Sequence, residues 1–312
     1  MTRSRVLVSG GSGLIGSSLI RALDAKSICI EQLTRQTRTL AIPETGREVL
    51  WNPMSANPLA DPGVLDGVEA VVHLSGANVA AHRWTDAYKG EIVSSRVRTT
   101  GALVSILTQL KQKPHVFLCA SAVGIYGDRG ESILDEDSPA GSGFLAETCR
   151  RWEDAANAAE DAGIRVISLR FGVVLTRKGG ALAKMLPLFR WGLGGKLGSG
   201  RQWMSWVTLR DAVRIILHGI DDETLRGPIN VTAPVPITNT EFTHALGRAV
   251  HRPAIAAAPA FALKLGVGQM AEEALLASVR AVPAKLAASG FRFQDGQIDG
   301  ALRAVLSGSE AG

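Results

Sequence analysis

The stretch LVSGGSGLIGSSLIRAL, residues 7–23, joins a short apolar run to an apolar helical pattern through a glycine-rich turn. Gly10, Gly13 and Gly16 give the spacing G-x-x-G-x-x-G. Glycine permits a tight turn and lets a pyrophosphate approach the main chain, where free N–H groups and the helix dipole hold it. The glycines could also serve only a tight strand-to-helix turn. The strand before them and the helix after them favour a dinucleotide site.

The remainder of the first half alternates between strand-like and helical patterns. Apolar runs typical of buried strands stand at residues 5–9, 27–35, 69–76, 115–121 and 164–175. Helical patterns lie between them, including a long one from Trp84 to Leu110. Continuous apolar strands that alternate with helices indicate a parallel sheet covered on both faces. We therefore predict a doubly wound, Rossmann-like α/β fold with right-handed crossovers.

The alternation of strand and helix patterns ends after Leu175. A glycine-rich segment and several prolines follow, and they predict shorter secondary-structure elements. We predict a dinucleotide-binding domain over residues 1–225 and a smaller, helix-rich substrate region over residues 226–312. Part of residues 176–206 is expected to form a lid over the substrate. A chain of 312 residues is long enough for such a large domain with a smaller partner.

Composition excludes several classes of function. The formal net charge is +5, but Lys and Arg are scattered along the chain, so we expect no nucleic-acid partner. No apolar run reaches the roughly 18 residues of a membrane span, and the N-terminus reads as a buried strand instead of a signal peptide. Three cysteines and six histidines show neither disulfide nor metal-ligand spacing, which favours a cytoplasmic protein without a metal.

Several motifs carry a resemblance to a known family. SGGSGLIG resembles the TGxxGxxG turn of short-chain dehydrogenases/reductases, in their extended, epimerase-like branch. HLSGAN (73–78), ASAVGIYGD (120–128) and LRFGVVL (169–175) resemble that branch's fourth, fifth and sixth strand segments. Over the whole chain, including KLAASGFRF near the C-terminus, the sequence is similar to an atypical subgroup known as epimerase family proteins. The resemblance implies a nicotinamide cofactor and a small-molecule substrate.

The end of the second strand bears on which cofactor is bound. NAD sites usually place an acid there for the ribose 2′-hydroxyl, whereas NADP sites place arginine. Here Arg35 and Arg38 follow Thr34, and Glu31 lies earlier within the strand. A guanidinium suits a phosphate, so we predict NADP, although Arg35 could be a plain surface residue. The residues expected at the cofactor, from the turn, the strand ends and the resemblance, are Gly10, Gly13, Leu14, Ile15, Gly16, Arg35, Arg38, Leu74, Ser75, Gly76, Glu91 and Arg96.

The sequence departs from the family's usual chemistry. Family members use a Tyr four residues before a Lys, so that one helical turn places the proton donor and its activating cation together. The chain has two tyrosines, Tyr88 and Tyr126, and neither has a lysine four residues later. Alignment on Trp152 puts Leu145 and Cys149 at the Tyr and Lys positions. The usual pair is absent from the sequence.

Two other hydroxyl groups are candidates for proton transfer. Ser121 matches the family's serine at the end of the fifth strand, although Ala122 could take that register instead. Tyr126 would lie near the substrate and could replace the missing acid, or it could only pack there. We therefore expect an NADP-dependent oxidoreductase or epimerase-like enzyme. The alternative is a non-catalytic NADP(H)-binding regulator, and a homodimer stays an option for either.

Overall fold

A seven-stranded parallel sheet forms the centre of the computed structural model, which describes residues 4–36 and 46–308. The strand order is β12-β7-β5-β4-β1-β2-β3, and every neighbouring pair is parallel. The strands are β1 (Arg5–Ser9), β2 (Cys29–Thr34), β3 (Gly46–Leu50), β4 (Ala70–His73), β5 (Val116–Ala122), β7 (Arg165–Phe171) and β12 (Gly227–Val231). This order confirms the predicted doubly wound fold. The order reverses between β1 and β4, and in such sheets ligands bind in the crevice at that point.

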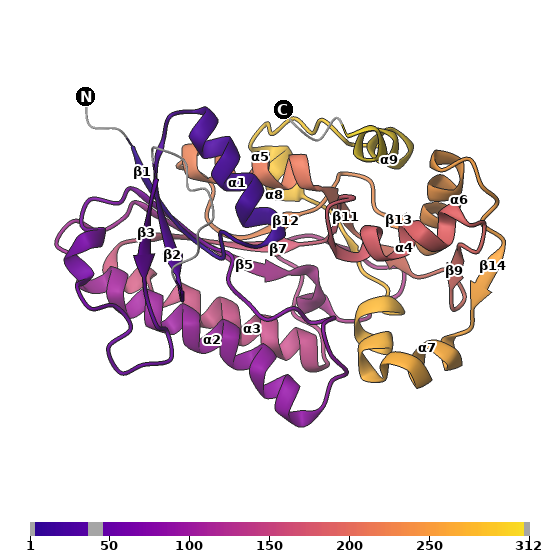
Figure 1. Cartoon of the computed structure of the whole chain (residues 1–312), viewed down its shortest axis with the longest axis horizontal. Coiled ribbons are helices and arrows are strands. Elements are labelled where there is room, and N and C mark those ends of the chain that lie inside the picture. Colours follow the sequence, from indigo (N-terminus) through magenta and orange to yellow (C-terminus); the bar gives the residue numbers. More distant parts are fainter. Residues whose placement is uncertain (1–3, 37–45, 309–312) are drawn as a thin grey trace.

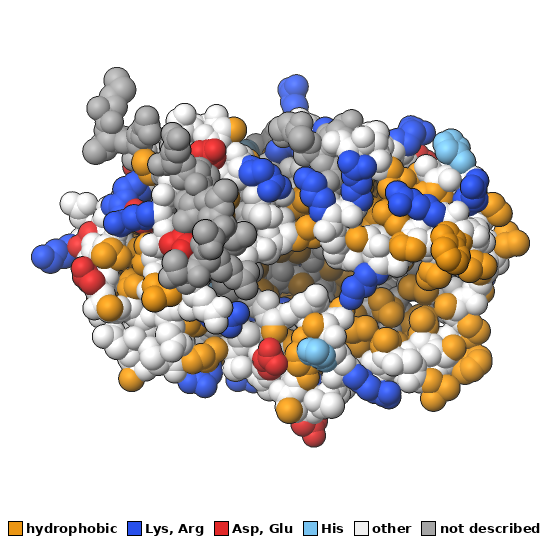
Figure 2. Space-filling view, viewed as in Figure 1, with side chains coloured by type: hydrophobic (Ala, Val, Ile, Leu, Met, Phe, Trp, Pro, Cys, Tyr) orange, Lys and Arg blue, Asp and Glu red, His pale blue; other side chains and the backbone are white. Residues whose placement is uncertain are grey.

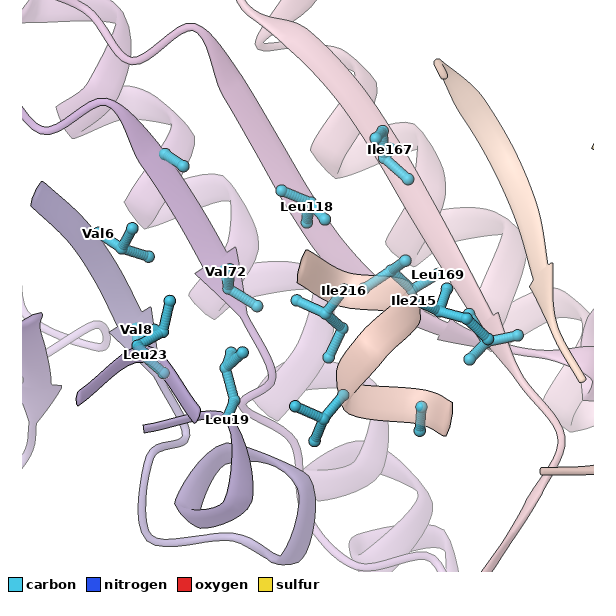
Figure 3. Close-up of a cluster of buried hydrophobic side chains, with 14 of the residues drawn as sticks. Val6, Val8, Leu19, Leu23, Val72, Leu118, Ile167, Leu169, Ile215 and Ile216 are labelled. Atoms are coloured by element: carbon cyan, nitrogen blue, oxygen red, sulfur yellow. The ribbon is translucent and has the colours of Figure 1, made fainter. Parts of the chain in front are cut away.

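Helices cover both faces of the sheet, α1 and α5 on one and α2 and α3 on the other (Figure 1). Their bounds are α1 (Leu14–Ala25), α2 (Asp86–Gln109), α3 (Phe144–Asn157) and α5 (Leu209–Asp221). Side chains alternate along each strand, so Val6 and Val8 pack with Leu19 of α1, while Leu7 packs with Leu107 of α2. Figure 3 shows the first of these two cores, between the sheet and α1 and α5. Burial of each such side chain stabilises the fold by about 1.5–3 kcal/mol.

Most of the remaining elements gather beyond one end of the sheet (Figure 1), whereas α8 (Ala284–Ala288) packs against β12 and buries Leu286 in the core shared with α1 and α5. The other helices are α4 (Gly180–Arg190), α6 (Asn239–Ala249), α7 (Ala260–Val267) and α9 (Ile298–Ser307). Four pairs of short strands connect them: β6 (Ile133–Leu134) with β15 (Arg280–Ala281), β8 (Val173–Leu175) with β11 (Trp206–Thr208), β9 (Gly195–Leu197) with β14 (Ala256–Ala258), and β10 (Trp203–Met204) with β13 (Ile237–Thr238). Short 3₁₀ or π turns at 62–65, 123–126, 160–162 and 271–275 complete the described elements.

Two observations bear on the predicted organisation, whose boundary between residues 225 and 226 is approximate and whose lid takes only part of residues 176–206. β12 is an edge strand of the main sheet, although it follows the boundary predicted between residues 225 and 226. Trp206, at the end of the predicted lid, is fully buried, and its indole N–H donates to the carbonyl of Val235. Residues 206–208 therefore belong to the core. A lid over the earlier part of the segment and the two-part division of the chain stay predictions.

Candidate functional site

The three glycines of the turn have different surroundings. Gly10 has φ +74°, and a Cβ there would lie 2.7 Å from the carbonyl carbon of Leu74. A Cβ on Gly16 would overlap the carbonyl oxygen of Gly10. Gly13 differs, because its Cβ would meet only that carbonyl oxygen, at 3.2 Å, and would otherwise face open space. Gly10 and Gly16 are thus required by the turn itself, whereas Gly13 leaves room for a ligand.

The turn presents the N-terminus of α1 to that open space. Gly13 is the N-cap residue, and no side chain caps this helix. The first main-chain N–H groups of a helix have no intrahelical acceptor and carry the positive end of its dipole. The turn therefore offers donors and partial positive charge to an anion, as a pyrophosphate site requires.

A cavity of about 340 Å³ extends from the glycine turn to α3. Its wall combines residues from the turn, from the ends of β4 and β5, and from α2 and α3. Those already named from the sequence are Gly10, Gly13, Leu14, Ile15, Gly16, Leu74, Arg96, Ser121, Ala122, Leu145, Cys149 and Trp152. The cavity lies at the carboxyl ends of the parallel strands, where ligands bind in open α/β sheets.

Arg96 of α2 is fixed beside the cavity by the main chain. Its guanidinium donates to the carbonyl oxygens of Ile92 at 3.1 Å and Ala77 at 2.9 Å, and it lies over the indole ring of Trp152. Burial lowers the pKa of Arg96 from its ordinary value, but the group stays charged near neutral pH. A cation is therefore built into the wall of the cavity.

Glu91, expected at the ribose or phosphates of the cofactor, lies outside this cavity, and its contact with the cofactor stays a prediction. Its side chain is exposed, and it does not line the cavity. Ile92 and Arg96 lie one helical turn apart on the cavity face, whereas Glu91 is one residue before Ile92. Successive residues of an α-helix are rotated by about 100°, so Glu91 turns toward solvent.

A small network of polar side chains joins the end of β1 to the end of β4 and to the segment that follows it. The hydroxyl of Ser9 bonds to Nδ1 of His73 and lies 3.0 Å from the hydroxyl of Ser75. Burial lowers the pKa of His73 to about 4, so the imidazole is neutral near pH 7. Leu74 lines the cavity, while Ser75 and Gly76 do not. The network therefore holds the strand end that carries Leu74.

The end of β2 has the charge pattern that the sequence predicted. Glu31 is buried and accepts bonds from Arg5, at 2.7 Å, and from Arg47. Its carboxylate, in the middle of the strand, is thus already engaged by these two arginines. Arg35 is exposed just beyond β2, and no bond within the described residues holds its guanidinium. Arg38 lies outside the described residues.

The residues at the Tyr and Lys positions face the cavity. Leu145 and Cys149 of α3 both line it, together with Thr148. Burial raises the pKa of Cys149 to about 11, so the group is a neutral thiol near pH 7. Neither side chain can hold the charge that an ordinary Tyr/Lys pair uses.

Behind this wall lies a buried ionic network that sequence reasoning missed. Ser121 lines the cavity, and its hydroxyl donates to Oε1 of Glu153 at 2.6 Å. Two bonds of 2.9 Å join Glu153 to the guanidinium of Arg170, and both residues are buried. Burial alone would lower the pKa of Arg170, but the Glu153 carboxylate reverses this and the net shift is upward. An arginine inside an apolar strand was the sequence signal for such a partner.

Tyr126 is not placed to donate a proton to a bound substrate, and its candidacy is corrected. Its side chain is fully buried and does not line the cavity. The hydroxyl lies 2.8 Å from Oδ1 of Asn230 and 2.9 Å from the carbonyl of Asp135, and it accepts a bond from Arg170. Burial raises its pKa. Tyr126 therefore extends the structural network around Arg170.

The doubly wound sheet, its glycine turn and the cavity beside it define a dinucleotide-binding protein of the short-chain dehydrogenase/reductase type. The chain belongs to the NAD dependent epimerase/dehydratase family, whose model matches residues 6–231. A second model, a domain of unknown function (DUF1731), matches residues 258–305. An epimerase family protein of Mycobacterium tuberculosis is 42% identical over 302 residues, which are 97% of each chain. A chloroplastic homolog in Arabidopsis thaliana is 36% identical and covers 96% of this chain and 86% of its own.

Two solved structures are similar to this chain to different extents. The human epimerase family protein SDR39U1, crystallised with NADPH, matches with a TM-score of 0.87 and 30% identity, over 97% of this chain and 99% of its own. A UDP-glucuronic acid 4-epimerase of Bacillus cereus in complex with NAD has a TM-score of 0.76 but only 14% identity, over 98% of this chain and 99% of its own. This second likeness shows the fold alone.

Proposed function

We propose that the protein is an NADP(H)-dependent oxidoreductase or epimerase-like enzyme that acts on a small molecule without the usual Tyr/Lys pair. The observation that carries this proposal is the single cavity that connects the glycine turn with Ser121 and α3. A dinucleotide whose pyrophosphate lies at the turn would extend its nicotinamide toward α3. The human structure that holds NADPH supports this choice of cofactor.

The described residues fit such a cofactor. The uncapped start of α1 and the open space beside Gly13 suit the pyrophosphate. Within residues 4–36 and 46–308 nothing pairs with the guanidinium of Arg35 beyond β2, and Glu31, the acid of that strand, is held by two arginines. We assign Arg35 to the phosphate on the adenosine ribose. Arg38 keeps the same assignment as a prediction.

Bound NADPH would supply the hydride, and the chain would orient the acceptor. Because Ser121 donates its own proton to Glu153, its oxygen has lone pairs left to accept a bond. A substrate hydroxyl, or the hydroxyl that forms when a carbonyl is reduced, is a donor that suits this oxygen. We assign Ser121 the role of positioning that group and relaying its proton. When a substrate hydroxyl is oxidised, its proton would pass to Ser121 while the proton of Ser121 passes to the Glu153 carboxylate, and the reduction of a carbonyl would run the same relay backwards from a protonated Glu153.

A non-catalytic NADP(H)-binding regulator is the second candidate. Among the described residues, the cavity wall has no Tyr, Lys, His, Asp or Glu. Its ionisable groups are Arg96 and Cys149, and neither loses or gains a proton readily near pH 7. A wall so poor in acids and bases favours binding without turnover. The Ser121 variant described in the Discussion separates the two functions.

Replacement of Gly13 by valine tests the position of the pyrophosphate. The backbone there is extended, with φ −77° and ψ 173°, so valine can adopt it, but its side chain would fill the open space. At 100 times Kd, NADPH should stabilise the wild type by about 2.7 kcal/mol, and the variant should lose this gain. Thermal unfolding with and without NADPH measures it. The control is Gly101→Val, because Gly101 is exposed on α2 and its Cβ would contact nothing. Equal stabilisation of both variants would place the cofactor elsewhere.

Replacement of Arg35 by alanine tests the preference for the phosphorylated cofactor. A hydrogen bond to a charged group contributes about 1.5–3 kcal/mol, so the variant should lose most of the preference for NADPH over NADH. Calorimetric titration with both cofactors gives the ratio. Lys113→Ala removes an exposed cation before β5, at the other end of the strands, and should leave the ratio unchanged. A wild type that binds both cofactors equally would refute the assignment.

A further inference from the structure

Large apolar side chains are exposed on three neighbouring segments far from the cofactor turn. They are Trp191 and Leu193 after α4, Ile255 before β14, and Phe261 and Leu265 on α7. Trp191 is 82% exposed and Ile255 is 86% exposed. Isolated exposed apolar residues are ordinary, but a contiguous group indicates a binding surface. We call this group the apolar patch.

Contacts between the segments bring the patch together. β9, which follows Leu193, pairs with β14, and Arg252 donates to the carbonyl of Arg190. α7 begins directly after β14 and contains no buried residue. Figure 2 shows hydrophobic side chains gathered over α7, β14 and the end of α4, with Lys and Arg around them.

The chain segments that carry the patch contain positively charged residues and no acidic ones. Residues 177–201 contain six Lys or Arg and no Asp or Glu. Residues 242–271 contain three Lys or Arg and no acid. Two of these cations are paired with acids outside the segments, Arg248 with Asp299 and Lys264 with Glu272. The others leave the surroundings of the patch positively charged.

A cleft lined by two arginines, of which Arg248 is paired with Asp299, adjoins the patch. It has a volume of about 650 Å³, and its wall includes His244, Arg248, His251, Arg252 and Ile255. Ile255 belongs to both the cleft and the apolar patch. A ligand that satisfies both would carry an anionic group next to an extended apolar part.

We propose that the patch and cleft dock the protein on the surface of an anionic lipid bilayer. Trp, Phe and Leu beside Lys and Arg are the side chains that place proteins at the boundary between headgroups and acyl chains. The cleft would take an anionic headgroup. A second copy of the chain would bring one positive surface against another and is disfavoured by that repulsion. Within residues 4–36 and 46–308 no helix is long and apolar enough to cross a bilayer, so docking would occur at the surface.

Sedimentation with vesicles tests this docking at physiological salt. The full chain should sediment with vesicles of equal phosphatidylglycerol and phosphatidylcholine and stay in solution with phosphatidylcholine alone. Trp191→Ser with Phe261→Ser should weaken binding at least about tenfold, because each buried CH₂ contributes to insertion. Lys196→Glu with Arg252→Glu should weaken it by at least about fivefold for each charge. The matched control is Ile133→Ser, an exposed apolar residue of β6 outside the patch.

Three outcomes would overturn the proposal. The wild type could fail to sediment with the anionic vesicles. The patch variants and Ile133→Ser could lose binding equally while all unfold at the wild-type temperature. Light scattering could show a wild-type dimer that Trp191→Ser dissociates, in which case the patch is an interface between copies of this chain.

Discussion

Replacing Glu153 by alanine is expected to lower the free energy of unfolding by about 3–5 kcal/mol, because it leaves the buried guanidinium of Arg170 without its anion. Both side chains are about 90% buried, and two bonds join them. The remaining acceptors of Arg170, the Tyr126 hydroxyl and the carbonyl of Glu136, are neutral. Urea unfolding followed by circular dichroism measures the loss.

The same helix supplies a control for this prediction. Glu147 of α3 pairs with Arg150, but both side chains are at least half exposed. Exposed pairs contribute little, so Glu147→Ala should change stability by no more than about 1 kcal/mol. Similar losses in the two variants would show that burial does not set the cost of breaking the Glu153 pair. A double variant that replaces Glu153 and Arg170 by apolar residues should be more stable than Glu153→Ala alone.

The fold could be read from the sequence because its signals are local. Three glycines after an apolar run fix one strand, one turn and one helix in consecutive residues. The cofactor side of the cavity follows from this unit, since the carboxyl ends of parallel strands meet at one edge. Glu31 and Arg35 were also placed correctly relative to the end of β2, because alternation and strand length are visible in the residues themselves.

The chemistry beyond the turn depends on contacts between distant segments. Tyr126 follows β5 closely, but only the tertiary structure shows that its hydroxyl turns away from the cavity toward Asn230, 104 residues later. Glu153 and Arg170 lie in a helix and a strand that no local pattern joins. A charged residue in each buried run was a signal that a partner exists, but only the tertiary structure shows which one.

The distribution of cations gives a second example. Along the sequence the Lys and Arg residues are scattered, which correctly argues against a continuous basic stretch. The pairing of β9 with β14 brings residues 195–197 beside residues 256–258, and with them two segments free of acids. Charge that is dilute along the chain is therefore concentrated on one surface by the fold.

Replacement of Ser121 by alanine is expected to reduce turnover by about 10²–10⁴, the usual contribution of a positioned proton-transfer group. The substitution removes one hydroxyl from the cavity wall and leaves the two bonds between Glu153 and Arg170 in place. NADPH affinity and stability should therefore change little. The rate of NADPH oxidation is measured with whichever compound of a broad carbonyl and sugar-nucleotide panel the wild type reduces.

Thr148→Val is the matched control, because Thr148 also lines the cavity but donates its proton to the carbonyl of Phe144 within its own helix. It should retain the wild-type rate. Equal losses in both variants would mean that the shape of the wall matters and that Ser121 transfers no proton. A wild type that binds NADPH tightly yet reduces nothing in the panel contradicts the enzyme and favours the regulator. The absence of acids and bases from the described cavity wall would then fit a protein that binds NADP(H) and transfers no proton.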